Sequence, residues 1–249
     1  MNRRRSRRRR RSSRRKNGLW IALAAAAAAL FLSVQPGQQL VRFLTDLIDP
    51  PEWIIVLDAG HGGFDGGAVS ESGMNEQAVN LSVAQRTRAL ACFFGVKTAM
   101  TREDEQALDY DSARSVRENK VADIRAREKI VNSFASPVFV SIHLKKFPDP
   151  QYHGAQVFYS ANSAAGKPLA EAMQRALVEG FDPENRRAAK QAEGSVYLMR
   201  VLRCPAVIVE CGFLSNPEEE SRLADENYHK KLALCIVTGY LRDADGHGG

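Results

Sequence analysis

Three predominantly apolar segments of strand length in this chain end directly in a polar side chain. They are residues 53–57 before Asp58, residues 137–142 before His143, and residues 205–209 before Glu210. Strands that are apolar on both faces are typical of a parallel sheet covered by helices on both sides. Segments with helical spacing alternate with these strands along the chain. The sequence therefore predicts a single α/β domain with a mostly parallel, twisted sheet and helices on both faces.

The remaining elements follow from hydrophobic periodicity and from turn residues. Two further strands are expected at residues 95–100 and 154–159. Helices are expected at residues 76–94, 123–134, 163–179 and 226–241, and the polar stretch at residues 101–120 is expected to be a loop. A glycine-rich turn at residues 60–67 follows the first strand, but it lacks the lysine and the spacing of a phosphate-binding loop.

The positive charge of the chain is concentrated at its N-terminus. The 249 residues carry a formal net charge of +6, yet residues 3–16 alone contain 11 basic side chains. The rest of the chain has 24 basic and 29 acidic residues, a net charge of −5. A mildly acidic body argues against nucleic-acid binding by the folded domain, so no nucleic-acid partner is expected.

An uncharged apolar stretch at residues 18–34 follows the basic run directly. Its 17 residues lie between the lengths of a signal peptide and a transmembrane helix. Because basic flanks stay in the cytoplasm, everything after this stretch is expected outside the membrane. We favour an uncleaved signal anchor over a cleaved signal peptide, since the residues after the apolar stretch form a poor cleavage site. A nucleic-acid-binding role for the basic run is the less favoured alternative.

These features predict five regions. They are a basic cytoplasmic arm (1–17), the signal anchor or signal peptide (18–34), a linker (35–51), a folded domain (52–243) and a disordered tail (244–249). The protein is thus predicted to act at the extracytoplasmic face of a bacterial membrane, anchored there or secreted. Its four cysteines show no metal-binding spacing, and we expect most of them to be small apolar core residues rather than disulfide partners.

The polar residues at the strand ends are the candidates for chemistry. The carboxyl ends of parallel strands meet at one edge of a sheet, where ligands bind. His143 alone could be a core histidine, and His61 alone a turn residue. Together, two imidazoles with nearby carboxylates fit a zinc site that keeps one coordination position open.

Glu210 and Glu76 are carboxylates with different alternatives. A carboxylate that continues a buried strand, as Glu210 does, is costly unless it meets a cation, a metal or a proton to transfer. The structural alternative for Glu210 is a buried ion pair with an arginine such as Arg127 or Arg187. Glu76 follows a good N-cap residue, so by itself it reads as a first-turn acid of a helix. Glu71 is its rival as a ligand, although its surroundings look like an exposed loop.

Four separated motifs, in order, resemble those of the zinc-dependent N-acetylmuramoyl-L-alanine amidases, the amidase-3 family. They are VLDAGHGGFDGGA (56–68), NEQAVNL (75–81), FVSIH (139–143) and PAVIVECGFLSN (205–216), and the resemblance covers residues 53–242. It implies that His61, Glu76 and His143 bind zinc and that Glu210 is the catalytic glutamate. The implied substrate is peptidoglycan, cut at the amide between N-acetylmuramic acid and L-alanine. Asp58 and Asp65 are candidates for supporting the ligands or for turn roles, and Arg127 and Arg187 for binding substrate carboxylates.

Within the family, the short domain and the N-terminal membrane segment are similar to the spore-cortex amidases. This similarity implies a role in cortex maturation, in which a deacetylase acts downstream to form muramic lactam. The small domain makes an accessory protein partner plausible. Lys145 departs from the pattern, since asparagine is expected at this position. Two alternatives stay open: another zinc hydrolase of cell-wall material, namely a peptidase or a deacetylase, and a catalytically inactive wall-binding module.

Overall fold

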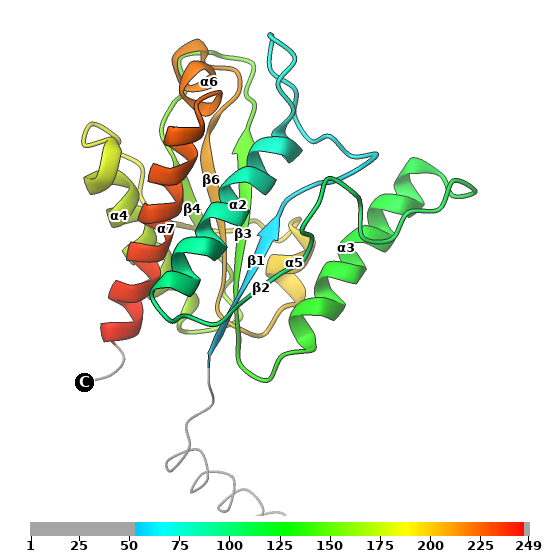
Figure 1. Ribbon diagram of the computed structural model, residues 1–249, viewed down its shortest axis with the longest axis horizontal. Helices are drawn as coiled ribbons and strands as arrows, with labels where there is room; N and C mark the ends of the chain where they lie inside the picture. The colour runs from blue at the N-terminus through cyan, green and yellow to red at the C-terminus, as the bar shows by residue number, and fades with distance from the viewer. Residues whose placement is uncertain (1–52, 247–249) are drawn as a thin grey trace, which may run out of the picture. The chain divides into compact units, whose positions relative to one another are not determined.

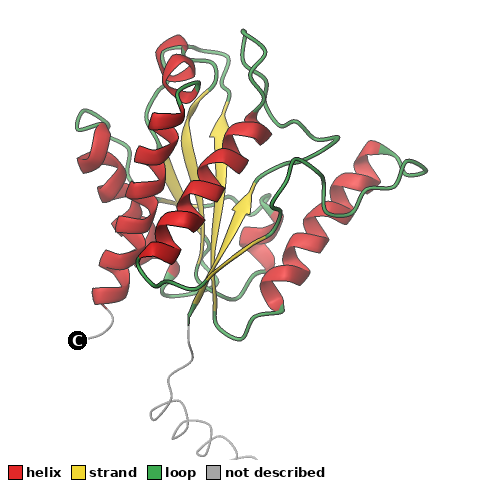
Figure 2. Ribbon diagram, in the orientation of Figure 1, coloured by secondary structure: helices red, strands yellow, loops and turns green. Residues whose placement is uncertain are grey.

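Six strands form one sheet in the order β2–β1–β3–β6–β4–β5 (Figures 1 and 2). The computed structural model describes residues 53–246. The strands are β1 (Ile54–Ala59), β2 (Thr98–Met100), β3 (Pro137–Lys145), β4 (Gln156–Tyr159), β5 (Lys190–Gln191) and β6 (Ala206–Phe213). β2, β1, β3 and β6 are parallel, and β4 pairs with β6 in the antiparallel direction. The predicted α/β class with a mostly parallel sheet is confirmed.

Helices cover both faces of the sheet (Figure 1). They are α2 (Glu76–Phe93), α3 (Val116–Asn132), α4 (Gly166–Phe181), α5 (Tyr197–Val201), α6 (Pro217–Leu223) and α7 (Glu226–Gly246). Residues of α2, α4 and α7 enclose the larger core with one face of the sheet. Residues of α3 and α5 enclose a smaller core with the other face.

Register places the polar strand ends beside one another. His143 on β3 is the partner of Glu210 on β6, and Gln156 on β4 is the partner of Glu210 from the other side. Residues in register share a face of the sheet, and side chains alternate between faces along a strand. Phe139 and Ala206, earlier on this same face, are fully buried under α3 and α5. His143 and Glu210 are only partly buried, so this face is open at the carboxyl ends of its strands.

Several element boundaries differ from the predicted ones. α3 begins at Val116, inside the stretch expected to be a loop, because Ser115 and Glu118 form a reciprocal capping box. Two short helices, α5 and α6, were not expected. α6 begins where Asn216 accepts hydrogen bonds from two backbone amides and Pro217 occupies the first turn. β3 and β6 continue beyond the apolar runs, so His143 and Glu210 lie within strands rather than after them.

The cysteines are all free. Cys211 and Cys235 are buried, as expected for core residues, whereas Cys92 is exposed and Cys204 is partly buried. The predicted arm, membrane segment and linker lie outside the described residues. Within residues 53–246, no helix is long and apolar enough to cross a bilayer.

Candidate active site

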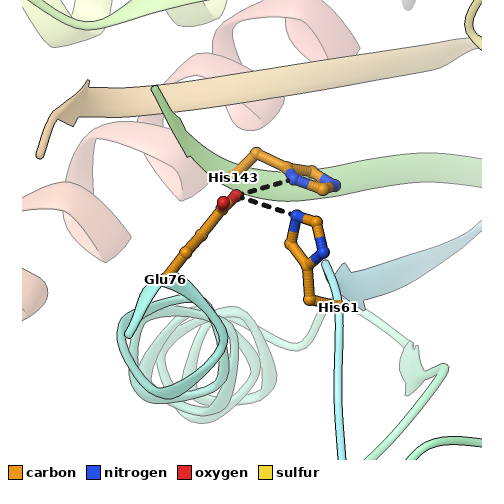
Figure 3. Close-up of side chains that lie close together, drawn as sticks. All are labelled: His61, Glu76 and His143. Carbon is orange, nitrogen blue, oxygen red and sulfur yellow. Dashed lines mark hydrogen bonds and ion pairs between the residues drawn. The ribbon is translucent and has the colours of Figure 1, made fainter. Parts of the chain in front are cut away.

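Three side chains from separate elements converge at the carboxyl end of the sheet (Figure 3). His61 comes from the loop after β1, Glu76 from the first turn of α2, and His143 from β3. The Glu76 Oε1 atom lies 3.2 Å from His61 Nε2 and 3.0 Å from His143 Nδ1. The two imidazole rings meet edge to face, with centroids 5.0 Å apart. The sequence placed the two histidines at one edge, and the structure brings the carboxylate of Glu76 into contact with both.

Glycines make this close approach possible. A Cβ atom on Gly60 would lie 2.2 Å from Cε1 of His143, so any side chain there would collide with the imidazole. A Cβ atom on Gly67 would lie 2.6 Å from Oε2 of Glu76, and Gly67 also has a φ of +69°. His61 itself has a φ of +63°, which is rare for a residue other than glycine. The loop is therefore built around its contact with Glu76 and His143.

Glu76 is held as an ionised carboxylate. Its Oε1 accepts a hydrogen bond from the Leu144 amide at 3.0 Å, and its Oε2 accepts one from the Ala68 amide at 2.8 Å. Burial raises the pKa of this carboxyl, but the hydrogen bonds and charges of the two imidazoles outweigh burial, so its pKa lies well below its ordinary value. Glu76 is the first residue of α2, but its side chain contacts His61 and His143. Glu71 is exposed, as expected for a loop residue.

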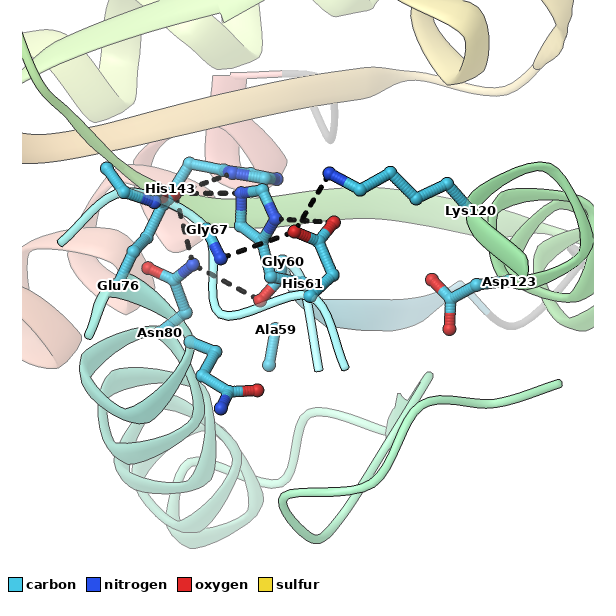
Figure 4. Close-up of polar contacts among 12 residues, drawn as sticks. Ala59, Gly60, His61, Gly67, Glu76, Asn80, Lys120, Asp123 and His143 are labelled. Carbon is cyan, nitrogen blue, oxygen red and sulfur yellow. Dashed lines mark hydrogen bonds and ion pairs between the residues drawn. The ribbon is translucent and has the colours of Figure 1, made fainter. Parts of the chain in front are cut away.

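Asp65 orients His61 from the far side of its ring and lies between His61 and Lys120, both of which are labelled in Figure 4. Asp65 Oδ2 lies 3.1 Å from His61 Nδ1, and Lys120 Nζ lies 3.0 Å from Asp65 Oδ1. Burial lowers the pKa of His61, but the contacts with Asp65 and Glu76 raise it to about 9. A carboxylate on the outer nitrogen of a histidine fixes its tautomer and aims the other nitrogen at the centre of a metal site. Asp65 thus has the supporting contact that was one of its two expected roles.

The three converging side chains can hold a metal ion. Their ligand atoms all lie within 4.8 Å of one another. Tetrahedral zinc with bonds of about 2.0–2.2 Å needs ligand atoms about 3.3 Å apart, close to the 3.0 and 3.2 Å contacts made by Glu76. Two imidazoles and one carboxylate are also a ligand set of catalytic zinc sites. The residues present fit such an ion.

Glu210 adds a carboxylate that has no fixed partner. Its Oε2 atom is buried and has no hydrogen-bond partner among the described residues. Burial raises the pKa of Glu210 above its ordinary value, although His143 and Lys145 act in the opposite direction. No ion pair joins Glu210 to Arg127 or Arg187 in the part of the chain that is described. A buried, unpaired carboxylate beside a metal site is suited to taking up and releasing a proton.

Arg127 supports the loop of His61 from its buried side, so its guanidinium is not free to bind substrate. Its buried guanidinium pairs with Asp58 through Nη1 and with Asp123 at 2.7 Å. It also donates hydrogen bonds to the carbonyl oxygens of Ala59, at 2.9 Å, and His61, at 2.6 Å. Asp58 accepts further hydrogen bonds from neighbouring hydroxyl groups and does not touch the ligands. Asp58 and Arg127 therefore hold the backbone that carries His61.

Arg102 is a supporting residue that the sequence reasoning missed. It donates to the carbonyl oxygens of Ala59 at 2.9 Å, Gly60 at 3.0 Å and Gln77 at 2.9 Å. Burial and the charge of Arg127 lower its pKa to about 10. Arg102 follows β2 almost directly, so the rule that singled out Asp58, His143 and Glu210 could have found it.

Comparisons with known proteins identify the family of this chain. Residues 55–242 match the Amidase_3 family, described as N-acetylmuramoyl-L-alanine amidase. The germination-specific N-acetylmuramoyl-L-alanine amidase of Bacillus subtilis is 37% identical over 189 residues, covering 76% of this chain and 78% of that protein.

Solved structures show the same fold. The CwlD amidase of Clostridioides difficile, determined in complex with the GerS lipoprotein, superposes with a TM-score of 0.75 at 34% identity, covering 78% of this chain and 98% of that chain. The catalytic domain of the amidase CwlV from Bacillus (Paenibacillus) polymyxa superposes with a TM-score of 0.63 at 28% identity, covering 77% and 98%. With the family match spanning most of the described residues, the chain belongs to the Amidase_3 family of N-acetylmuramoyl-L-alanine amidases.

Proposed function

We propose that this amidase is zinc-dependent, with His61, Glu76 and His143 as the zinc ligands and Glu210 as the proton-transferring residue. The observation that carries the proposal is the convergence of two imidazoles on one ionised carboxylate, with a second, unpaired carboxylate in register with His143. When bound, zinc supplies Lewis-acid chemistry that makes water a stronger nucleophile near neutral pH and polarises a carbonyl group.

The protein's own residues handle the proton. Glu210 Oε2 accepts a proton from the attacking water as the new C–O bond forms at the lactyl carbonyl. Glu210 then donates that proton to the nitrogen of L-alanine as the C–N bond breaks. The products are a glycan with a free lactyl carboxylate and a stem peptide with a free amino terminus. Asp65 keeps the His61 ring in place throughout, because it holds Nδ1.

The relatives and the N-terminal sequence also support a proposal for the biological setting. We propose action outside the cytoplasmic membrane on spore cortex, where removal of stem peptides precedes muramic lactam formation by a deacetylase. The similarity to a germination-specific amidase and to CwlD supports this setting. Since CwlD was solved with the GerS lipoprotein, an accessory lipoprotein is the kind of partner we propose for this chain.

Digestion of peptidoglycan tests the reaction and the metal together. The full-length protein, purified in detergent, is incubated with sacculi with and without a zinc chelator, and the products are identified by mass. We expect intact stem peptides beginning with L-alanine, and we expect chelation to stop their release until zinc is added back. Shortened peptides still bound to the glycan would indicate a peptidase, released acetate a deacetylase, and no product an inactive module.

A further inference from the structure

Three cationic side chains on the open face that carries Glu210 have no acidic partner in an ion pair. Lys145 is on β3, Arg187 precedes β5, and Lys190 is on β5. Within residues 53–246, none of the three makes an ion pair. We call these three residues the cationic rim. Their charges are available to an anion that enters the site.

The sheet holds the cationic rim on the same open face as Glu210. Gln156 and Phe158 of β4 are on this face, because Gln156 is the register partner of Glu210. Phe158 is in turn the register partner of Lys190. The Lys145 ammonium lies over the Phe158 ring, 4.2 Å from its centroid. A cation over an aromatic face is held in place without losing its charge.

Arg187 is fixed on the same side. Its Nη1 lies 3.3 Å from Gln156 Oε1, and its Nε donates to the His153 carbonyl oxygen at 2.8 Å. Its guanidinium lies over the ring of Phe213, 4.8 Å from the centroid, and Phe213 is the register partner of Lys145. The guanidinium thus has no carboxylate partner and still keeps a defined position.

The charges in this region act on one another. Burial lowers the pKa of the Lys145 ammonium, as do the charges of Arg187 and Lys190, while Glu210 and Glu193 raise it. The cationic rim and Glu210 therefore share one electrostatic environment.

We propose that the cationic rim, centred on Lys145, binds the free α-carboxylate of the second stem-peptide residue. This inference rests on the proposed function. Same-face side chains on a strand are about 7 Å apart, so Lys145 lies about that far along β3 from His143. The α-carboxylate of the second residue lies about two residue lengths, or about 7 Å in an extended peptide, from the scissile carbonyl carbon. The enzyme consequently prefers stem peptides with D-isoglutamate over the amidated form, D-isoglutamine.

The experiment compares two substrates that differ only in that group. The full-length enzyme is assayed on muramyl-L-Ala-D-isoglutamate and muramyl-L-Ala-D-isoglutamine peptides, with kcat and KM measured separately. Lys145→Gln should raise KM for the isoglutamate substrate about tenfold or more, with kcat little changed, and should hardly affect the amidated substrate. Lys145→Arg should restore the preference. Arg186→Gln, next to Arg187 but exposed and paired with Glu184, is the matched control.

A second measurement does not depend on turnover. Calorimetry of the released L-Ala-D-isoglutamate peptide should show weaker binding to Lys145→Gln than to wild type, whereas the isoglutamine peptide should bind both equally. An equal loss on both substrates, mainly in kcat and with a shifted pH profile, would mean that Lys145 acts through Glu210 and would overturn the proposal. Failure of wild type to release any stem peptide would instead count against the proposed function, and the calorimetry would still decide the cationic rim.

Discussion

At the scale of single residues, the histidines of this domain show what separates a structural imidazole from a ligand. His229 is buried, and its two ring nitrogens lie 2.7 Å from Ser82 Oγ and 2.7 Å from the Leu223 carbonyl oxygen. Both of its polar atoms are satisfied by neutral neighbours. His61 and His143 instead converge on a carboxylate from a third element. Taken alone, His143 could be a core histidine and His61 a turn residue, and only their joint position at the strand ends favours chemistry.

Changing Glu210 to Gln should separate chemistry from metal binding. The amide keeps the size of the side chain but cannot accept the proton, so hydrolysis should fall about 10²- to 10⁴-fold. Zinc content, measured by atomic absorption, should stay at the wild-type level. Glu171→Gln, an exposed position on α4, is the control. Full activity of Glu210→Gln would point to another base, and loss of zinc would make Glu210 a ligand.

Changing Asp65 to Asn should weaken zinc binding without removing a ligand. The amide oxygen of Asn is a neutral acceptor, so it holds His61 Nδ1–H less strongly than the carboxylate does. Loss of such a supporting contact typically costs about 10- to 100-fold in metal affinity. Competition with a chromophoric chelator measures the change. Asp149→Asn, in the loop between β3 and β4, should leave the affinity unaltered. Unchanged zinc affinity in Asp65→Asn would return Asp65 to a simple turn role.

At the scale of elements, a buried ion pair joins the parts that carry the site. Asp58 of β1 accepts hydrogen bonds from Thr101 after β2, at 2.7 Å, and from Ser141 of β3, at 2.6 Å, and it pairs with Arg127 of α3. Burial raises the pKa of Asp58, but Arg127 and the two hydroxyl groups hold it below its ordinary value. One carboxylate therefore fixes two strands and one helix around the loop of His61.

Changing Asp58 to Asn should lower the free energy of unfolding by about 3 kcal/mol or more at pH 7, because the buried guanidinium of Arg127 loses its charged partner. A depressed pKa in the folded state gives stability that is present above the unfolded value, about 3.9, and is lost as pH falls below it. The difference in the free energy of unfolding between wild type and Asp58→Asn should therefore become smaller below about pH 4. Urea unfolding at several pH values measures it.

The surface pair of Asp109 and Arg114 provides the control for this measurement. Its atoms are 2.9 Å apart, but both side chains are substantially exposed. Asp109→Asn should change the free energy of unfolding by less than about 1 kcal/mol. A difference for Asp58→Asn that stayed constant down to pH 3 would show that the carboxylate charge does not carry the effect.

The elements also show how far the sequence alone could lead. The hydrophobic pattern located β1, β3, β6 and the four longest helices. A helix that buries one stripe has a period of about 3.6 residues, and a strand that is buried on both faces is a continuous apolar run. The pattern could not locate α5 or α6, which are too short for a periodic pattern. It also placed the start of α3 too late, because this helix has few apolar residues and its start depends on the capping by Ser115. The roles of Glu76 as a proposed ligand and of Asp65 as the support of His61 needed the tertiary fold or the family resemblance, since neither residue has a distinctive local context.

At the scale of the whole molecule, the proposed zinc ligands connect a loop, a helix and a strand, so the ion should stabilise the entire domain. Ligand bound only to the native state adds about 4 kcal/mol at a free concentration 1,000 times its dissociation constant. Thermal melting of the chelated protein should therefore rise on zinc addition. His143→Ala should abolish the rise, and His153→Ala, at an exposed position, should keep it. An equal rise in both variants would exclude the assigned site.

The orientation of the chain across the membrane is a second property of the whole molecule. We predict that a reporter active only outside the cytoplasm, fused after Pro36, gives a signal, because the 11 basic residues hold the N-terminus inside. Replacement of the arginines by glutamine should reduce that signal. A reporter that works only in the cytoplasm, fused at the same position, should stay silent, and its activity would contradict the predicted location.

The two faces of the sheet are covered unequally by helices, and this difference affects how such an enzyme can diverge. Lys145 lies on the open face, while Leu144, one position earlier, is buried in the larger core under α2, α4 and α7. Under the proposed role of the cationic rim, exchange of Lys145 alters which stem peptide is accepted without repacking the interior, whereas exchange of Leu144 would disturb the core. Related enzymes can therefore diverge in substrate preference through residues of the open face, while the core that directs folding stays the same.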